Sequence, residues 1–169
     1  MSVDTRWLTP RQLAAWVRLA AVLELLPATL DSQLRRDADL THFDYYVLAM
    51  LSEAPEHTLR MTALAERTTA TLARLSHVVH RLEGRGLLHR FPCPQDRRAT
   101  NARLTETGWQ KVRDSAPGHV ATVRENVIDA LTPEQITQLG EISDAILHRL
   151  DPDGAKAALY QRYDPPPAT

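Results

Sequence analysis

The chain has 169 residues, of which 43% are hydrophobic and 24% charged, as expected for one globular domain. A single cysteine, Cys93, excludes an internal disulfide framework and a four-cysteine zinc site. The six glycines form no glycine-rich loop that could hold a nucleotide phosphate. We therefore expect neither a cofactor nor nucleotide chemistry.

Hydropathy along the chain predicts no membrane segment. The most apolar stretch, residues 19–30, is interrupted by Glu24 and Pro27 and falls short of the roughly 18 to 20 apolar residues that a membrane helix requires. Asp4 and Arg6 stand where the apolar part of a signal peptide would begin. With a lone cysteine as well, the expected location is the cytoplasm.

The net charge of −1 conceals an uneven distribution of charge. Residues 60–113 contain eleven basic and four acidic side chains, so this stretch carries +7 and the rest of the chain −8. Such a local excess of positive charge is typical of a segment that contacts a polyanion. A solvated helix surface rich in arginine is the alternative interpretation.

Two capping boxes predict helix starts near the two ends of the chain. Thr9-Pro10-Arg11-Gln12 places a capping threonine before a proline that suits the first helical position. Apolar residues with helical spacing follow, and Pro27 is expected to kink or end this helix near residue 26. Thr132-Pro133-Glu134-Gln135 repeats the signal before the last helix. Residues 152–169 are expected to form a loose tail.

The last predicted helix carries a regular apolar stripe. Its members recur at spacings of 3, 3, 4 and 4 and are Ile136, Leu139, Ile142, Ile146 and Leu150. A stripe of this length on a terminal helix needs another surface to cover it. Identical chains usually pair about a two-fold axis, so we expect these residues in a homodimer interface.

The middle of the chain predicts a winged helix-turn-helix. One helix is expected between Thr41 and Pro55, a short one at 61–68, and another from the capping residue Thr71 to Gly84. Leu72, Leu75, Val78, Val79 and Leu82 are expected on the apolar side of that third helix. Two strands, 87–91 and 99–104, then flank an exposed loop at 92–98. In this arrangement the second helix of the pair enters the major groove and the hairpin reaches the backbone or minor groove.

Four segments in the same region carry a specific resemblance. They are MTALAERT from Met61, LSHVVHRLEGRG from Leu75, DRRAT from Asp96 and LTETG from Leu104. Together they resemble the MarR family of bacterial transcription regulators, and the match covers about residues 43–108. The family often has a glycine in the turn before the recognition helix, where this chain has Thr69. Its peroxide-sensing members carry a reactive cysteine near the start of the chain, and this sequence has none there.

The resemblance implies a mostly α fold with a small β-hairpin wing and a homodimer. A winged helix-turn-helix lobe at about 41–108 would stand between dimerisation helices at about 9–40 and 109–151. The implied partners are double-stranded DNA with a pseudo-palindromic operator, a second copy of the chain and a possible small-molecule effector.

The residues expected to contact DNA lie on the recognition helix and the wing. They are Thr71, Arg74, Ser76, His77, Arg81, Asp96, Arg97 and Arg98. Arg74 could pair with guanine, and Ser76 and His77 could reach base edges or phosphate. Arg81 could instead pair with a neighbouring acid. The resemblance implies that Arg98 enters the minor groove and that Asp96 orients it.

Two further patterns leave alternatives open. His77, His80 and Glu83 recur every three residues, but zinc pairs on helices more often use i, i+4 spacing, so we predict no metal site. Cys93 is expected to be exposed near Arg90, Arg97 and Arg98, which would favour its thiolate. A redox-responsive regulator is therefore an alternative to a cysteine without a regulatory role.

The resemblance also implies a pocket where the dimerisation helices meet the DNA-binding lobe, which can take small aromatic acids. Candidate ligand-binding residues are Trp16, Arg18, His42, Tyr45 and Tyr46, although all five could instead be core or interface residues. The sequence predicts a sequence-specific DNA-binding regulator, most simply a repressor relieved by a small ligand. A winged-helix protein-interaction module is the alternative. No nucleophile stands in a recognisable catalytic motif, so we predict that the protein is not an enzyme.

Overall fold

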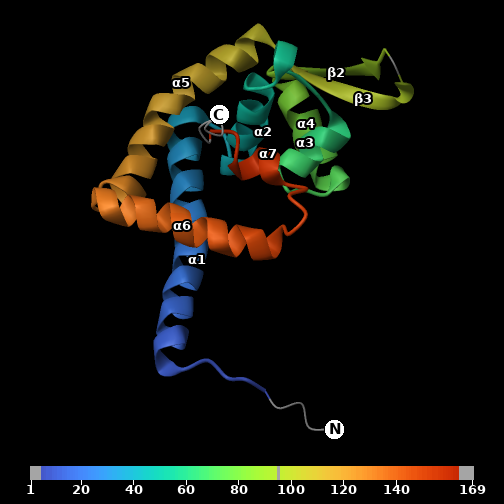
Figure 1. Cartoon of the computed structure of the whole chain (residues 1–169). Helices are drawn as coiled ribbons and strands as arrows, with labels where there is room; N and C mark the ends of the chain where they lie inside the picture. Colours follow the sequence, from blue (N-terminus) through green and yellow to red (C-terminus); the bar gives the residue numbers. More distant parts are fainter. Residues whose placement is uncertain (1–4, 95, 164–169) are drawn as a thin grey trace, which may run out of the picture.

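A computed structural model describes residues 5–94 and 96–163 (Figure 1). In chain order the elements are α1 (Pro10–Ala38), α2 (His42–Ser52), η1 (Pro55–His57), β1 (Thr58–Arg60), α3 (Met61–Arg67), α4 (Leu72–Gly84), β2 (Leu88–Cys93), β3 (Asp96–Leu104), α5 (Glu106–Val123), η2 (Arg124–Ile128), α6 (Pro133–Leu150) and α7 (Ala157–Tyr160). The predicted fold class, mostly helical with a small β-hairpin, is confirmed.

The first helix is longer than predicted. α1 begins at the expected capping box, in which Gln12 N donates to Thr9 Oγ1 and Thr9 N donates to Gln12 Oε1. Pro27 was expected to kink this helix or end it near residue 26. The helix does not end there, because α1 continues to Ala38. A proline removes one backbone donor, and helix-favouring residues stand on both sides of it. The last part of α1 is also buried against the lobe at Leu30, Gln33, Leu34 and Ala38.

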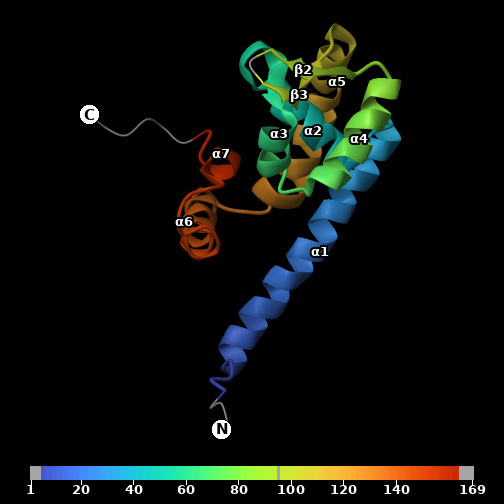
Figure 2. The ribbon, with the colours of Figure 1, turned by 90° about the vertical axis from the view of Figure 1, so that its right-hand side faces the viewer.

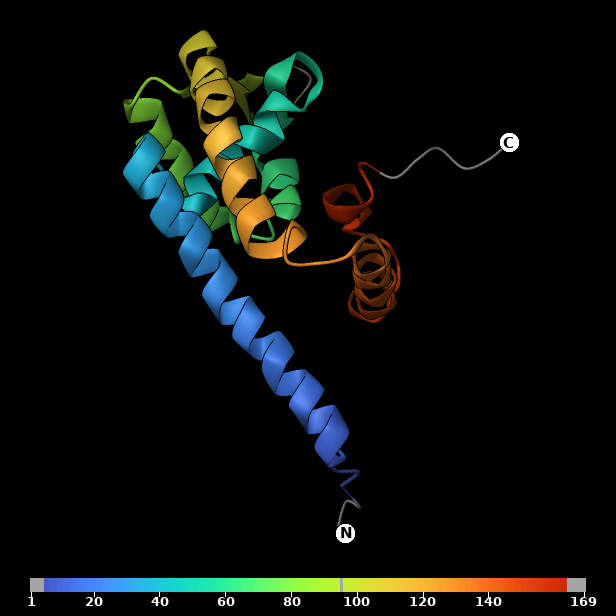
Figure 3. The same ribbon diagram turned by 90° about the vertical axis from the view of Figure 1, so that its left-hand side faces the viewer.

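Among the described residues, α1 is apolar over a long stretch, which by itself is weak evidence for a membrane span. An 18-residue window within α1 has a mean hydropathy of 1.6, so this helix is long and apolar enough to cross a membrane by length and composition alone. Only 6% of that window is buried, and Trp16, Val17 and Leu23 are each more than half exposed. α1, like the core helices of soluble proteins, therefore passes a test of length and composition only. Figures 2 and 3 show its first half extending away from the rest of the molecule.

The wing is longer than predicted. β2 and β3 pair antiparallel from Leu88 opposite Leu104 to Cys93 opposite Asp96, so most of the expected loop at 92–98 lies in strands. The sheet order is β1-β3-β2, which makes β2 an edge strand. An edge strand tolerates Pro92, and the register shifts between Pro92 and Cys93. β1 was not predicted, because three residues are too short to show alternation.

The core lies within the helix-turn-helix lobe. Its fully buried side chains include Leu48 and Leu51 of α2, Leu64 of α3, and Leu75, Val79 and Leu82 of α4. The predicted apolar side of α4 is therefore confirmed except at Leu72, which is 48% exposed. Leu72 is the first residue of α4 and precedes the buried residues of that helix.

The C-terminal part contains a second correction. α6 begins at the predicted capping box of Thr132 and Gln135, and none of its residues is buried. Residues 152–163 are not a loose tail, because they include α7 and two of them bind Glu53, the residue that follows α2. Arg162 forms an ion pair with Glu53 over 3.1 Å, and the Tyr163 hydroxyl donates to it over 2.8 Å. The tail expected at 164–169 lies outside the described residues. α6 crosses α1 in Figure 1, but Figures 2 and 3 show the two helices apart.

Candidate nucleic-acid interface

The turn between α3 and α4 has a left-handed residue at the position where the family often has glycine. Thr69 has a φ of 51°, the left-handed region that favours glycine. The neighbouring Thr68 hydroxyl donates to Leu64 O over 2.7 Å, which fixes the end of α3. Thr71 then caps α4 by accepting a hydrogen bond from Arg74 N over 3.2 Å. These contacts set the angle at which α4 leaves the turn.

A groove of about 220 Å³ separates the start of α4 from the wing. It is lined by Arg60, Met61, Thr62, Leu72, Ser76, Arg90, Arg98, Ala99 and Thr100. Two of the residues expected to contact DNA, Ser76 and Arg98, therefore meet at one surface. Arg60, Thr62 and Arg90 were missed as site residues, although Arg60 and Arg90 were counted in the charge excess. Arg60 could have been recognised as a site residue from the sequence, because this basic residue immediately precedes the first helix of the helix-turn-helix.

Arg74 and Arg81 lie on another side of α4, toward α2. The Arg74 guanidinium stands 4.3 Å from the centroid of the Phe43 ring, a cation–π contact that leaves the arginine exposed. Arg81 forms an ion pair with Asp44, whose side chain is 3% exposed. Of the two alternatives for Arg81, pairing with an acid is thus the one that the structure contains. His77 is exposed on α4.

Asp96 connects the wing to the start of α3. Its Oδ1 accepts the backbone N–H of Arg98 over 3.1 Å, and its Oδ2 lies 3.7 Å from Arg60 Nη1. Arg98 is exposed and has no ion-pair partner among the described residues. The side chain of Arg97 lies outside the described part of the structure. The exposed charge at the wing is therefore available for a polyanion.

A family sequence description and solved structures agree with this arrangement. A model described as "MarR family" matches residues 40–100. The crystal structure of Sco3205, a MarR family transcriptional regulator from Streptomyces coelicolor in complex with DNA, is 43% identical, with 90% of this chain and 95% of that chain covered and a TM-score of 0.85. The chain belongs to the MarR family.

Two other relatives support the assignment. AbsC, a MarR family transcriptional regulator from Streptomyces coelicolor, is 40% identical over 88% of this chain and 100% of that chain, with a TM-score of 0.83. The transcriptional repressor IacR of Pseudomonas putida is 25% identical over 119 residues, which are 70% of each chain. This MarR-family regulator thus shares both its lobe and its flanking helices with relatives of known structure.

Cys93 is buried in this regulator, contrary to the expectation that it is exposed. Its relative exposure is 3%, and Arg60 Nη2 lies 3.5 Å from its Sγ. The pairing of β2 with β3 encloses the thiol, which the sequence-based loop would have left in solvent. A buried thiol is poorly accessible to oxidants, which weighs against the redox alternative.

Glu83 is engaged by arginine. Its carboxylate accepts hydrogen bonds from Arg90 N, Nε and Nη2 over 2.7, 2.9 and 2.7 Å, and the side-chain bonds in particular hold the pKa of Glu83 below its ordinary value. Arg90 Nη2 also lies 3.3 Å from His80 Nδ1. Within residues 5–94 and 96–163 there is no group of three or more potential metal ligands.

The five candidate ligand residues do not form one pocket within a single chain. Trp16 and Arg18 are exposed on the projecting half of α1, and Arg18 donates to Ala14 O over 2.9 Å. His42 and Tyr45 approach His119 of α5, whereas the Tyr46 hydroxyl donates to Arg67 O over 3.1 Å. Burial raises the pKa of both tyrosines.

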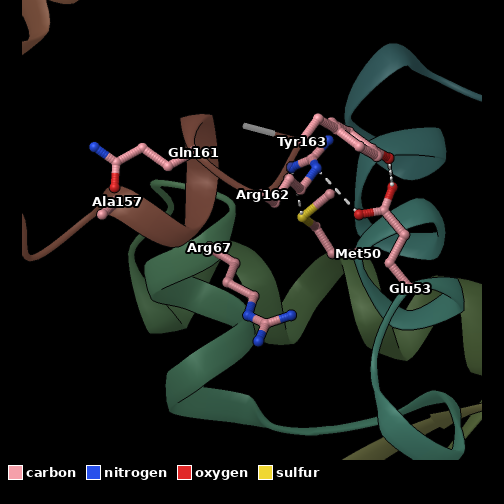
Figure 4. A pocket seen from close by; sticks show the side chains of 7 residues that line it. All are labelled: Met50, Glu53, Arg67, Ala157, Gln161, Arg162 and Tyr163. Carbon is pink, nitrogen blue, oxygen red and sulfur yellow. Dashed lines mark hydrogen bonds and ion pairs between the residues drawn. The ribbon is translucent and has the colours of Figure 1, made fainter. Parts of the chain in front are cut away.

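The cavities elsewhere around the lobe include two that are larger than the groove between α4 and the wing. One of about 600 Å³ separates α2 and the end of α3 from the C-terminal segment (Figure 4). It is lined by Met50, Glu53, Arg67, Ala157, Gln161, Arg162 and Tyr163. The second, about 450 Å³, lies between α1 and the end of α5 and η2, next to Gln33. Neither could be identified from the sequence, because each joins segments that are far apart in the chain.

Proposed function

We propose that this chain represses transcription as a homodimer that binds duplex DNA. In each subunit α4 would enter the major groove, and the β2–β3 wing would reach the adjacent backbone or minor groove. The observation that carries the proposal is the groove between α4 and the wing, where Ser76 meets Arg60, Arg90 and Arg98. The related Sco3205 was solved in complex with DNA, which supports DNA binding by this chain.

The expected DNA contacts differ in their roles. Thr71, Ser76 and His77 would face the major groove, and Arg97 and Arg98 would follow the sugar–phosphate backbone or the minor groove, with Asp96 orienting Arg98. Arg74 would reach a base edge from its position over Phe43. Arg81 would act through Asp44, by holding α4 on α2, rather than by touching DNA.

Exposed apolar surface supports the homodimer. The stripe Ile136, Leu139, Ile142, Ile146 and Leu150 is 39%, 42%, 59%, 40% and 75% exposed. The projecting half of α1 exposes Leu13, Trp16, Val17 and Leu23 in addition. Contiguous apolar surface of this kind is typical of an interface. A second copy would bury both surfaces and set two recognition helices about one DNA turn apart, about 10 base pairs.

Relatives named as repressors support repression, and relief by a small ligand is part of the same proposal. The Pseudomonas putida relative is named a transcriptional repressor. An aromatic acid could enter where α1 of one subunit approaches the lobe of the other, which would bring Trp16 and Arg18 to a cavity that one chain leaves open. A regulator of this kind would work in the cytoplasm as a DNA-binding protein without enzymatic activity.

Selection of bound sequences from random duplex DNA, with and without phenolic acids, tests the proposal. A pseudo-palindromic consensus that loses occupancy with a phenolic acid is the expected result. Affinity for that duplex should fall steeply with salt, because phosphate contacts release counterions. Absence of any duplex binding at low salt would favour the protein-interaction module instead.

A further inference from the structure

Two histidines meet where the DNA-binding lobe joins the flanking helices. His42 is the first residue of α2, and its ring centroid lies 5.9 Å from that of His119 on α5. The His119 ring also contacts Tyr45, with 4.7 Å between centroids. Among the described residues, the buried Nδ1 of His119 has no hydrogen-bond partner. No sequence pattern had marked His119 as a site residue.

The charged groups around this pair offer little compensation for a proton. On α1, Asp31 is paired with Arg35 over 2.5 Å and accepts the backbone N–H of His42 over 2.8 Å. Asp37, also on α1, binds Gln33 and Arg36. Glu53, which follows α2, and Tyr163 both interact electrostatically with Tyr45 and bind each other.

Burial is the main cause that lowers the pKa of both rings. For His119 the neighbouring His42 lowers the pKa further, whereas Asp31 partly opposes the effect of burial on His42. The protonated form of either histidine is therefore disfavoured while α2 and α5 are in contact.

The same turn of α2 also holds the recognition helix. His42 and Tyr45 face α5, while Phe43 and Asp44, which stand between them in the chain, hold Arg74 and Arg81 of α4. A displacement of this turn from α5 must therefore also change how α4 is held. Distant groups couple in this way when one rigid element contacts both.

We propose that the contact of His42 and Tyr45 with His119 is a proton-sensitive switch that weakens DNA binding in acid. A proton on either imidazole separates the first turn of α2 from α5 and shifts α4 through Phe43 and Asp44. The inference rests on the proposed DNA-binding function.

The direction of the effect follows from the lowered pKa values. In the unfolded or opened state both rings titrate near the ordinary histidine pKa of about 6.5. Above that value both rings are neutral and the contact contributes fully to stability. The contribution is lost as the pH falls from about 6.5 through the lowered folded pKa, because the opened state then binds more protons. His77 is exposed on α4 at the proposed DNA surface, so a variant that lacks its imidazole serves as the control.

Affinity for the selected duplex, measured by fluorescence anisotropy at constant ionic strength between pH 8 and 5.5, tests the switch. Native protein is expected to lose about fivefold or more in affinity, within the usual range of coupling between sites. His119→Phe keeps a ring against Tyr45 and should lose little. The control His77→Gln should retain the acid loss. The proposal would be overturned if the affinity of both the native protein and His77→Gln stayed constant or rose in acid. It would also be overturned if His119→Phe lost as much affinity in acid as the native protein.

A measurement without DNA separates this inference from the proposed function. The free energy of unfolding of the native protein, measured with urea, should fall between pH 7.5 and 5.5, and His119→Phe and His42→Phe should each show a smaller fall. His42→Phe replaces the comparison if His119→Phe does not fold. If the native protein binds no duplex at pH 8, the proposed function fails, whatever the urea titration shows. If it binds DNA but the variants keep the native pH dependence of stability, the switch fails alone.

Discussion

Asp44 of α2 and Arg81 of α4 form an ion pair whose carboxylate side chain is only 3% exposed. Asp44 also completes the cap of its own helix, because its Oδ2 accepts Thr41 N over 3.0 Å. One carboxylate therefore fixes the start of α2 and the position of the recognition helix together.

Replacement of Arg81 by methionine should act on stability more than on DNA contacts. The buried carboxylate of Asp44 would lose its charged partner, at an expected cost of about 2 kcal/mol in the free energy of unfolding. Urea denaturation measures this cost. The control Arg85→Met breaks a pair with Asp39, which is 94% exposed, and should cost less than about 1 kcal/mol. Equal costs in the two variants would contradict a special role for the Asp44 pair.

Gly108 is expected to tolerate no side chain. A β-carbon at Gly108 would overlap the backbone carbonyl of Leu87 and touch the Leu104 side chain. Gly108→Ala should therefore destabilise the lobe by about 3 kcal/mol, the upper range for overpacking. Gly84→Ala is the matched control, because a β-carbon there meets nothing within 4 Å, and its midpoint of thermal unfolding should change little. A normal midpoint for Gly108→Ala would show that the start of α5 can move.

Arg98→Ala should weaken binding to all duplexes alike. Arg98 is exposed in the wing and lines the groove, so its loss should remove about one phosphate contact and flatten the slope of log affinity against log salt by about 0.9 per subunit. Titration of the variant at several salt concentrations measures the slope. Arg113→Ala removes the same charge from an exposed position on α5 and should leave the slope unchanged. An unaltered slope for Arg98→Ala would count against the wing as a DNA element.

Arg74→Ala should change sequence preference rather than overall affinity. Loss of a guanidinium that reads a base edge costs about 1 to 3 kcal/mol at that base position. Repeating the duplex selection with the variant should show one relaxed position in each half-site. Phe43→Leu removes the ring beneath Arg74 and should relax the same position to a smaller extent. A uniform loss over all sequences would identify Arg74 as a phosphate contact instead.

Leu139→Asp should abolish dimerisation and tight DNA binding together. The charge would be placed in the apolar stripe of α6, and a single lobe would keep half of the contacts. Light scattering with a parallel DNA titration measures both properties. Thr137→Asp adds the same charge about 160° around the helix and should leave the dimer intact. A monomeric native protein, or a monomeric variant that still binds the full site tightly, would overturn the dimer proposal.

Much of the fold could be predicted because its signals are local. The caps at Thr9, Thr71 and Thr132 lie within one turn of the helices they begin, and the buried side of α4 follows a 3.6-residue period. The wing was predicted too short, since strand pairing depends on a partner strand rather than on neighbouring residues. The left-handed conformation of Thr69 was not predicted, because a threonine gives no local signal for a positive φ.

The sequence by itself determined the helix order, the hairpin, the family and the basic charge of the region that faces the proposed DNA. Only the tertiary structure decided which arginines are committed to acids: Arg81 to Asp44, Arg90 to Glu83, and Arg60 to Asp96. It also decided that Cys93 is buried and that His119 contacts His42. Arg60 and Cys93, which lie close together in the fold, are 33 positions apart in the chain, and His42 and His119 are 77 positions apart. The physical reason is the range of each signal. Capping and periodicity act within a few residues, whereas burial and ion pairing depend on which segments the folded chain brings together.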